Sequence, residues 1–230
     1  MTKRRRTSRR TRRYLNTDGL RNRTDTRMAF PDGSYGRESQ WFFRILALSN
    51  AVFGFSLTLL VVNIGVPSGT SAADLGQSIV DLFPNFVAFA LTVFIVALYW
   101  YNHNSLFESL RGIDMPMIGL GLVYLALIAL LPFPNELLGN YPTEPLSYVA
   151  FATLLTGLAT VDTVMLAYAK RRNLTDPSIP LKTHRIDLLR GSITIVIFAA
   201  SVPISFVLVE WTPICWLLLL AFDRAVLRYG

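Results

Sequence analysis

The sequence predicts an all-α integral membrane protein with six transmembrane helices and both termini in the cytoplasm. Three observations lead to this prediction: high apolar content, segment length and one-sided positive charge. Hydrophobic residues make up 52% of the 230-residue chain, and the mean hydropathy is +0.42. Long apolar runs with few charges are typical of membrane spans. In lipid, a helix satisfies every backbone polar group within its own segment.

Six segments are long and apolar enough to be predicted as spans, because roughly 20 residues cross a hydrocarbon core of about 30 Å. The connections are short and leave no room for a soluble domain. The runs are too evenly apolar for barrel strands. The third span is short, and the sixth has only the brief apolar core CWLLLLAF. The predicted spans are 43–64, 79–101, 115–132, 146–169, 188–208 and 212–227.

The positive charges predict the orientation of these spans. Cytoplasmic connections of membrane proteins are enriched in Lys and Arg. The connections at 65–78, 133–145 and 209–211 contain neither residue, so every Lys and Arg falls on the other side of the six-span scheme. Both termini are therefore predicted to be cytoplasmic, and the chain is expected to be a multi-pass protein of the cell membrane.

Residues 1–40 are predicted to form a basic, disordered cytoplasmic tail, and residues 41–230 the six-helix transmembrane domain. The tail holds 12 basic and 4 acidic residues, a net charge of +8, whereas the rest of the chain is at −1. Arg-rich segments without apolar periodicity are typically disordered. Such a cluster favours anionic lipid of the bilayer by roughly 1 kcal/mol per basic residue. The scarcity of aromatic residues argues against nucleic-acid binding, while a transit peptide and a true start at Met28 stay open.

The sequence lacks the patterns of common enzyme and cofactor chemistry. It has no Gly-rich phosphate loop, one cysteine, and two histidines that are not at metal-ligand spacing. We therefore expect no enzyme activity, no cofactor and no metal site. The cysteine, Cys215, is expected to pack within an apolar run, since it has no partner in the chain for a disulfide.

The first predicted span carries more polar side chains than a lipid-facing helix needs. Ser49, Ser56 and Asn63 are seven residues apart and form one polar stripe, while a second stripe is mostly apolar. Small hydroxyl residues let membrane helices pack closely. An amide in hydrocarbon, however, needs a partner or water. The span is therefore expected to pack inside a bundle or to line a water-filled path.

Four segments in order resemble the transmembrane protein 175 family, the endosomal and lysosomal potassium channels and their prokaryotic relatives. In that family the first span has Arg, three residues and Phe-Ser-Asp, then Thr-Leu-Leu-Val and a Val-Pro exit. This chain has RILALSNAVFGFSLTLLVVNIGVP at 44–67. Three later segments of this chain also resemble elements of the family: YWYNHNSLF at 99–107, LLPFPNELLGNY at 130–141 and SVPISF at 201–206. The resemblance extends over residues 41–228.

The resemblance implies a potassium-permeable cation channel that assembles as a homotetramer. The first span of each subunit would line a central pore for potassium ions. A bulky apolar side chain would form the constriction, and a Thr three residues later would help to select potassium. These positions correspond to Phe55 and Thr58, followed by Leu59 and Val62. The polar stripe is then assigned to packing against neighbouring spans.

The resemblance also implies a polar network at the cytoplasmic end of the first two spans, with His103 expected to contact the Ser49–Asn50 end of the first span. This chain departs from the family at two positions. Asn50 replaces the motif Asp and cannot form an ion pair with Arg44, and Phe55 is larger than the usual Ile or Leu. Four phenyl rings at one level predict a narrow pore or one gated by dewetting. The motif residues are Arg44, Ser49, Asn50, Trp100, Asn102 and His103.

Asp162, within the fourth predicted span, is the clearest charge inside the membrane. Intramembrane carboxylates usually face the bundle and pair with another group. Arg44, Arg190 and His103 are the candidate partners. Two alternatives to a channel stay open: a proton- or ion-coupled transporter with Asp162 and His103 as relay groups, and a non-conducting membrane scaffold whose tail recruits a partner or lipid.

Overall fold

The computed structural model describes residues 33–62, 64–65, 70–209, 212 and 216. Within these residues the chain forms seven α-helices and one antiparallel two-stranded ladder. The strands are β1 (Tyr35–Gly36) and β2 (Gly112–Ile113). The helices are α2 (Gln40–Val62), α3 (Leu75–Asp81), α4 (Phe83–Ser109), α5 (Met115–Leu130), α6 (Pro132–Asn140), α7 (Pro145–Arg171) and α8 (Leu181–Ser205).

Five helical stretches in the described part of the chain are long and apolar enough to cross a membrane. Four are α2, α4, α7 and the Arg185–Ser205 part of α8, and the fifth joins α5 and α6 over Met115–Asn140. The prediction of a helical, multi-pass membrane protein is confirmed for these residues. Of the sixth predicted span, 212–227, only Thr212 and Trp216 are described. The Trp216 indole packs 5.1 Å from the Phe151 ring and donates to the Ser201 hydroxyl at 3.2 Å.

Two predicted boundaries differ from the structure. The second span does not end at residue 101, because α4 continues to Ser109. Its polar residues are accommodated by the fold: His103 is buried, and the Asn104 amide donates to the Trp100 carbonyl at 2.9 Å. The third span does not end at residue 132 either. The segment expected as an outer connection begins with α6, so a proline-rich stretch extends the span.

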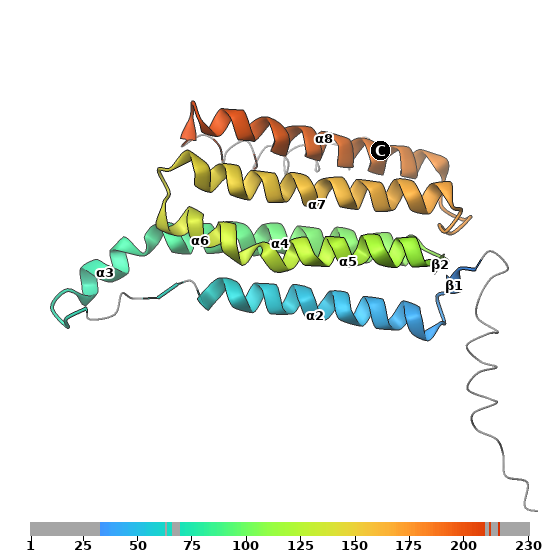
Figure 1. Ribbon diagram of the computed structural model, residues 1–230, viewed down its shortest axis with the longest axis horizontal. Coiled ribbons are helices and arrows are strands. Elements are labelled where there is room, and N and C mark those ends of the chain that lie inside the picture. The colour runs from blue at the N-terminus through green and yellow to red at the C-terminus, as the bar shows by residue number, and fades with distance from the viewer. Residues whose placement is uncertain (1–32, 63, 66–69, 210–211, 213–215, 217–230) are drawn as a thin grey trace, which may run out of the picture.

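The helices form three layers (Figure 1). α2 lies alone along one side, α4, α5 and α6 lie in the middle, and α7 and α8 pair on the far side. The side chains buried between these layers are large and mostly apolar. They include Phe53 from α2, Val96 from α4, Tyr124 from α5 and Phe151 from α7. Within the described residues α2 therefore buries one face and leaves the other open, whereas α7 packs between α5 and α8.

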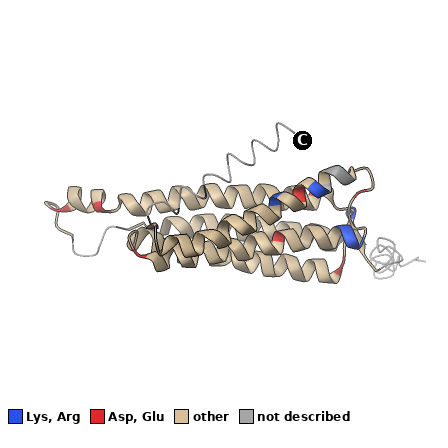
Figure 2. Ribbon diagram, turned by 90° about the horizontal axis from the view of Figure 1, so that it is seen from above, with Lys and Arg blue, Asp and Glu red and all other residues tan. Residues whose placement is uncertain are grey.

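The described Lys and Arg residues gather at one end of the bundle (Figure 2). At that end β1 pairs with β2, Leu110 bridges to Thr175, and the Arg111 N–H donates to the Leu174 carbonyl at 2.8 Å. Residues 33–39, which we assigned to the tail, are thus joined by backbone hydrogen bonds to the α4–α5 connection. The α7–α8 connection is joined to the same loop.

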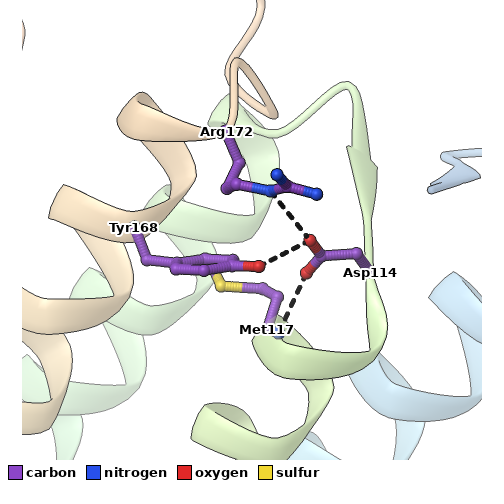
Figure 3. Close-up of polar contacts among 4 residues, drawn as sticks. All are labelled: Asp114, Met117, Tyr168 and Arg172. Atoms are coloured by element: carbon purple, nitrogen blue, oxygen red, sulfur yellow. Dashed lines mark hydrogen bonds and ion pairs between the residues drawn. The ribbon is translucent and has the colours of Figure 1, made fainter. Parts of the chain in front are cut away.

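Asp114 holds the basic end of α5 against the end of α7 (Figure 3). Its carboxylate caps α5 by accepting the Met117 N–H at 3.0 Å. It also accepts the Tyr168 hydroxyl at 2.7 Å, and the Arg172 Nε lies 3.7 Å from it. An N-cap carboxylate satisfies helix-terminal N–H groups and interacts favourably with the helix dipole. One side chain therefore both starts α5 and fixes its distance to α7.

We predict that Asp114→Ala lowers the free energy of unfolding in detergent by about 1–3 kcal/mol, because the cap and the bond to Tyr168 are lost together. Thermal unfolding followed by circular dichroism measures the change. Glu144→Ala is the matched control, since Glu144 precedes α7 as its N-cap but makes no side-chain cap bond. Equal effects of the two substitutions would contradict this role for Asp114.

Candidate pore helix and its polar contacts

The helix α2 has one buried face and one exposed face. The buried residues recur at spacings of three and four, the repeat of an α-helix surface. This face packs against α4, α5 and α6. It consists of Phe42, Ile45, Ser49, Phe53, Ser56 and Leu60. Asn63, the third member of the predicted polar stripe, lies outside the described residues.

Ser49 connects α2 to α4 through His103. The Ser49 hydroxyl donates to the Ile45 carbonyl at 2.8 Å, and the His103 Nε2 lies 3.0 Å from the same hydroxyl oxygen. Because the hydroxyl proton is used on Ile45, the bond requires the proton on Nε2 of the imidazole. The expected contact between His103 and the Ser49–Asn50 end of α2 is therefore present.

Aromatic rings enclose His103. The imidazole stacks on Tyr124 with 4.9 Å between centroids and 7° between planes, and Phe107 lies 4.6 Å away. Phe53 from α2 lies 5.8 Å away. The side chain is fully buried, and Nδ1 has no hydrogen-bond partner. The histidine thus fills the joint between α2, α4 and α5 as a packed side chain with one polar contact.

Ser56 connects α2 to α5. Its hydroxyl donates to the Ile128 carbonyl at 2.9 Å, and both groups are buried. Ser49 and Ser56 lie seven residues apart, which is about 10.5 Å along a helix. Two hydroxyl groups therefore tie the same face of α2 to the bundle at two levels.

The four residues expected at the pore lie on the opposite face. Phe55 is 68% exposed, Val62 71% and Leu59 39%, and Thr58 is exposed between them. Arg44 belongs to the same exposed arc, with its guanidinium 5.7 Å from the Trp41 ring. No described element of the same chain covers this face.

Thr58 presents its hydroxyl oxygen on the exposed face. The hydroxyl donates to the Phe55 carbonyl of the preceding turn at 2.8 Å. Its proton is used in that bond, while lone pairs of the oxygen remain available as acceptors. The oxygen can therefore face a cation without first losing a hydrogen bond.

Asn50 and Trp100 form a second contact between α2 and α4. The Trp100 indole donates to the Asn50 side-chain oxygen at 3.0 Å, and both residues are exposed. Asn50 thus acts as an uncharged acceptor at the motif position. Asn102 is exposed one residue before the buried His103, and the structure assigns it no role in these contacts.

Asp162 lies on the inward stripe of α7, four residues after Leu158 and three before Met165, both of which are fully buried. Its Oδ1 is buried and has no hydrogen-bond partner. None of the three expected partners makes a recorded ion pair with it within the described residues: Arg190 lies 3.8 Å from Asp187, Arg44 sits on the exposed face of α2, and His103 contacts Ser49.

Sequence reasoning missed two contributors to this site. Tyr124 supplies the ring under His103, and the Ile128 carbonyl receives Ser56. The proline pair in LLPFP was a signal for the second, because proline removes a backbone donor and leaves a carbonyl for another group. No comparable signal marked Tyr124, since an aromatic residue in an apolar span is ordinary. No cluster of His, Cys, Asp or Glu able to hold a metal occurs in the part that the structure describes.

The sequence comparisons identify channel relatives. Residues 44–132, which extend from α2 through α5, match the family model described as endosomal/lysosomal potassium channel TMEM175. A potassium channel from Streptomyces collinus is 24% identical over 71% of this chain and 82% of its own length. One from Chamaesiphon minutus is 32% identical over 50% of this chain and 57% of its own length. The mouse endosomal/lysosomal proton channel TMEM175 is 28% identical over 65% of this chain, which spans 30% of that relative.

The solved structures agree in fold. The crystal structure of a lysosomal potassium-selective channel TMEM175 homolog from Chamaesiphon minutus aligns with a TM-score of 0.68 at 22% identity, over 80% of this chain and 96% of that one. The crystal structure of a variant of the potassium channel MtTMEM175 aligns with a TM-score of 0.59 at 17% identity, over 87% and 99%. The sequence match over α2 to α5 and these relatives show that the chain is similar to the TMEM175 family, whose members are channels and not enzymes.

Proposed function

We propose that this protein is a potassium-permeable cation channel in which four copies surround a pore lined by α2. Phe55 forms the constriction, and Thr58, Leu59 and Val62 line the path beyond it. The relatives named as potassium channels support potassium as the permeating ion, and the open face of α2 supports the position of the pore.

The observation that carries this proposal is the polar content of the open face of α2. Arg44 and Thr58 lie on the side of a membrane-spanning helix that the rest of the described chain does not cover, and Asn50 lies at the edge of this side, where it accepts from Trp100 of α4. Polar and charged groups facing lipid are costly, and such groups usually face a cavity or another helix. Ala51 and Gly54 on the same side allow helices to approach closely. Contact with further copies around a water-filled path satisfies both requirements.

Phe55 and Thr58 would divide the work of the pore. A ring of four phenyl groups repels water and raises the barrier to every ion, as hydrophobic constrictions do. Thr58 lies one helical turn away, where its oxygen would offer an acceptor to an ion that has lost part of its hydration shell. The pore would therefore conduct weakly, and it would select between ions near the levels of Phe55 and Thr58.

We further propose that the basic end of the bundle faces the cytoplasm, with both termini on that side. The described Lys and Arg residues gather at this end (Figure 2), as expected for a cytoplasmic surface. Of the predicted tail, the Arg-rich part before β1 would then lie against anionic lipid of the inner leaflet.

Replacing Phe55 with Ala is predicted to raise potassium flux at least roughly tenfold and to reduce the preference for potassium over sodium. Four large side chains would then be removed from the narrowest level of the pore. The measurement is ion flux from proteoliposomes that contain the purified protein.

Phe83→Ala is the matched control for this experiment, because Phe83 on α4 is also 68% exposed. It should leave flux and selectivity near the wild-type values. A folded oligomer that passes no potassium with or without Phe55 would exclude the channel and favour the membrane scaffold. Equal effects of the two substitutions would show that Phe55 does not define the path.

A coupled transporter is the second candidate function, because the Asp162 carboxylate has a buried oxygen without a hydrogen-bond donor. A relay through the core would use this group, whereas a pore along α2 would not. For the channel we predict that Asp162→Asn changes potassium flux less than about twofold, since the amide keeps the size of the side chain. The same liposome assay tests this. Loss of potassium flux in Asp162→Asn, together with a flux in Phe55→Ala equal to that of the wild type, would favour the transporter.

A further inference from the structure

We propose that Ser56 is a positioning residue for the pore, and that it acts through the backbone carbonyl that Pro132 leaves without its helical donor. The Ser56 hydroxyl would hold α2 at one rotation, which keeps Phe55 turned away from the bundle. This inference rests on the proposed function for its effect on ions, but the linkage itself can be tested without any flux.

The first step concerns the break between α5 and α6. α5 ends at Leu130 and α6 begins at Pro132, although the two helices together make one membrane-spanning stretch. In a continuous helix the N–H of residue 132 would donate to the carbonyl of residue 128. Proline has no N–H, so this bond cannot form. The Leu131 N–H instead donates to the Ile128 carbonyl at 3.2 Å, which closes a tighter turn.

The second step concerns what replaces the missing donor. The Ser56 hydroxyl donates to the Ile128 carbonyl at 2.9 Å from the neighbouring helix α2. In lipid, carbonyls freed by proline are satisfied by Ser or Thr side chains or by neighbouring helices. The Ile128 carbonyl therefore lacks the N–H of residue 132 and accepts two other donors, the Leu131 N–H and the Ser56 hydroxyl.

The third step concerns the anchoring of the break. α6 is held to α4 by two polar contacts: the Thr92 hydroxyl donates to the Asn135 side chain at 2.8 Å, and the Asn85 amide donates to Asn140 at 2.9 Å. A Cβ on Gly139 would meet the Asn85 backbone at 3.1 Å, so the two helices cross closely there. The Ile128 carbonyl is consequently presented to α2 from a fixed frame.

The fourth step connects this bond to the constriction. Phe55 precedes Ser56, and adjacent side chains on a helix point about 100° apart. Ser56 faces α5 and is 2% exposed, so Phe55 faces out of the bundle, where it is 68% exposed. Ser49 holds the basic half of α2 through His103. Ser56 holds the half that carries Phe55 and Thr58, so its loss would free the rotation of the level at which ions are selected.

A double-mutant cycle tests the proposal on the full-length protein in liposomes, with Ser56→Ala, Pro132→Ala and the double variant. Alanine at 132 supplies a helical N–H that competes for the Ile128 carbonyl, so we expect the serine bond to contribute less in this background. We expect Ser56→Ala to lower the potassium-to-sodium flux ratio about fivefold in the wild-type background, the change typical for one hydrogen bond. In the Pro132→Ala background it should change the ratio less than about twofold.

Two further variants separate positioning from general damage. Ser56→Thr keeps the hydroxyl and should restore most of the selectivity lost in Ser56→Ala. Ser192→Ala removes an exposed hydroxyl on α8 that donates only to its own helix, at the Leu188 carbonyl, and should change nothing. Equal losses from Ser56→Ala in both backgrounds, or an unchanged flux ratio in Ser56→Ala, would overturn the proposal.

Melting temperatures of the wild type and the three variants of the cycle test the linkage separately from the channel. Ser56→Ala should lower the melting temperature in the wild-type background and leave it nearly unchanged beside Pro132→Ala. Equal lowering in both backgrounds would overturn the linkage. A wild-type protein that passes no potassium would instead contradict the proposed function, while the melting cycle still decides whether Ser56 and Pro132 act through one carbonyl.

Discussion

Polar groups inside the bilayer must find partners within the protein, and the arrangement of α2 depends on this requirement. Water is not available in the hydrocarbon core, so an unpaired group costs far more there than at a wet surface. Ser49 and Ser56 meet the requirement on the inner face of α2, one through His103 and one through the Ile128 carbonyl. These two bonds lie among the buried apolar side chains of α2, on the side that faces its own bundle.

The other side of α2 is defined by what remains. Phe55 and Thr58 are turned outward because the two serines are turned inward, and their spacing along the helix leaves no other choice. Two hydroxyl groups on a mostly apolar inner face also disfavour a rotation of α2 by one residue, since a rotation of about 100° would bury the Phe55 ring where the Ser56 hydroxyl now bonds. The geometry of a channel lined by α2 would thus be set from inside each subunit rather than by the pore itself.

A different device governs the basic end of the bundle, which lies outside the apolar region. There Asp114 caps α5 and contacts Tyr168 and Arg172 (Figure 3). Short backbone pairings join the loop after α4 to the segment before α2 and to the loop after α7. These contacts use charge and backbone pairing, which suit a surface in contact with water. The segment directly before α2 is therefore held by its pairing with β2.

The sequence by itself determined the membrane class, five of the spans, the one-sided basic charge and the resemblance to a channel family, because hydropathy, charge and local motifs are properties of short segments. It also singled out Ser49 and His103 as a pair through the motif. Only the tertiary structure decided that α4 runs on to Ser109, that LLPFP continues a span, and that Ser56 meets Ile128. Polar side chains in these segments find partners on other helices, 54 residues away for His103 and Ser49 and 72 for Ser56 and Ile128. The prolines of LLPFP indicate that a carbonyl lacks a donor, but no local pattern identifies the distant partner.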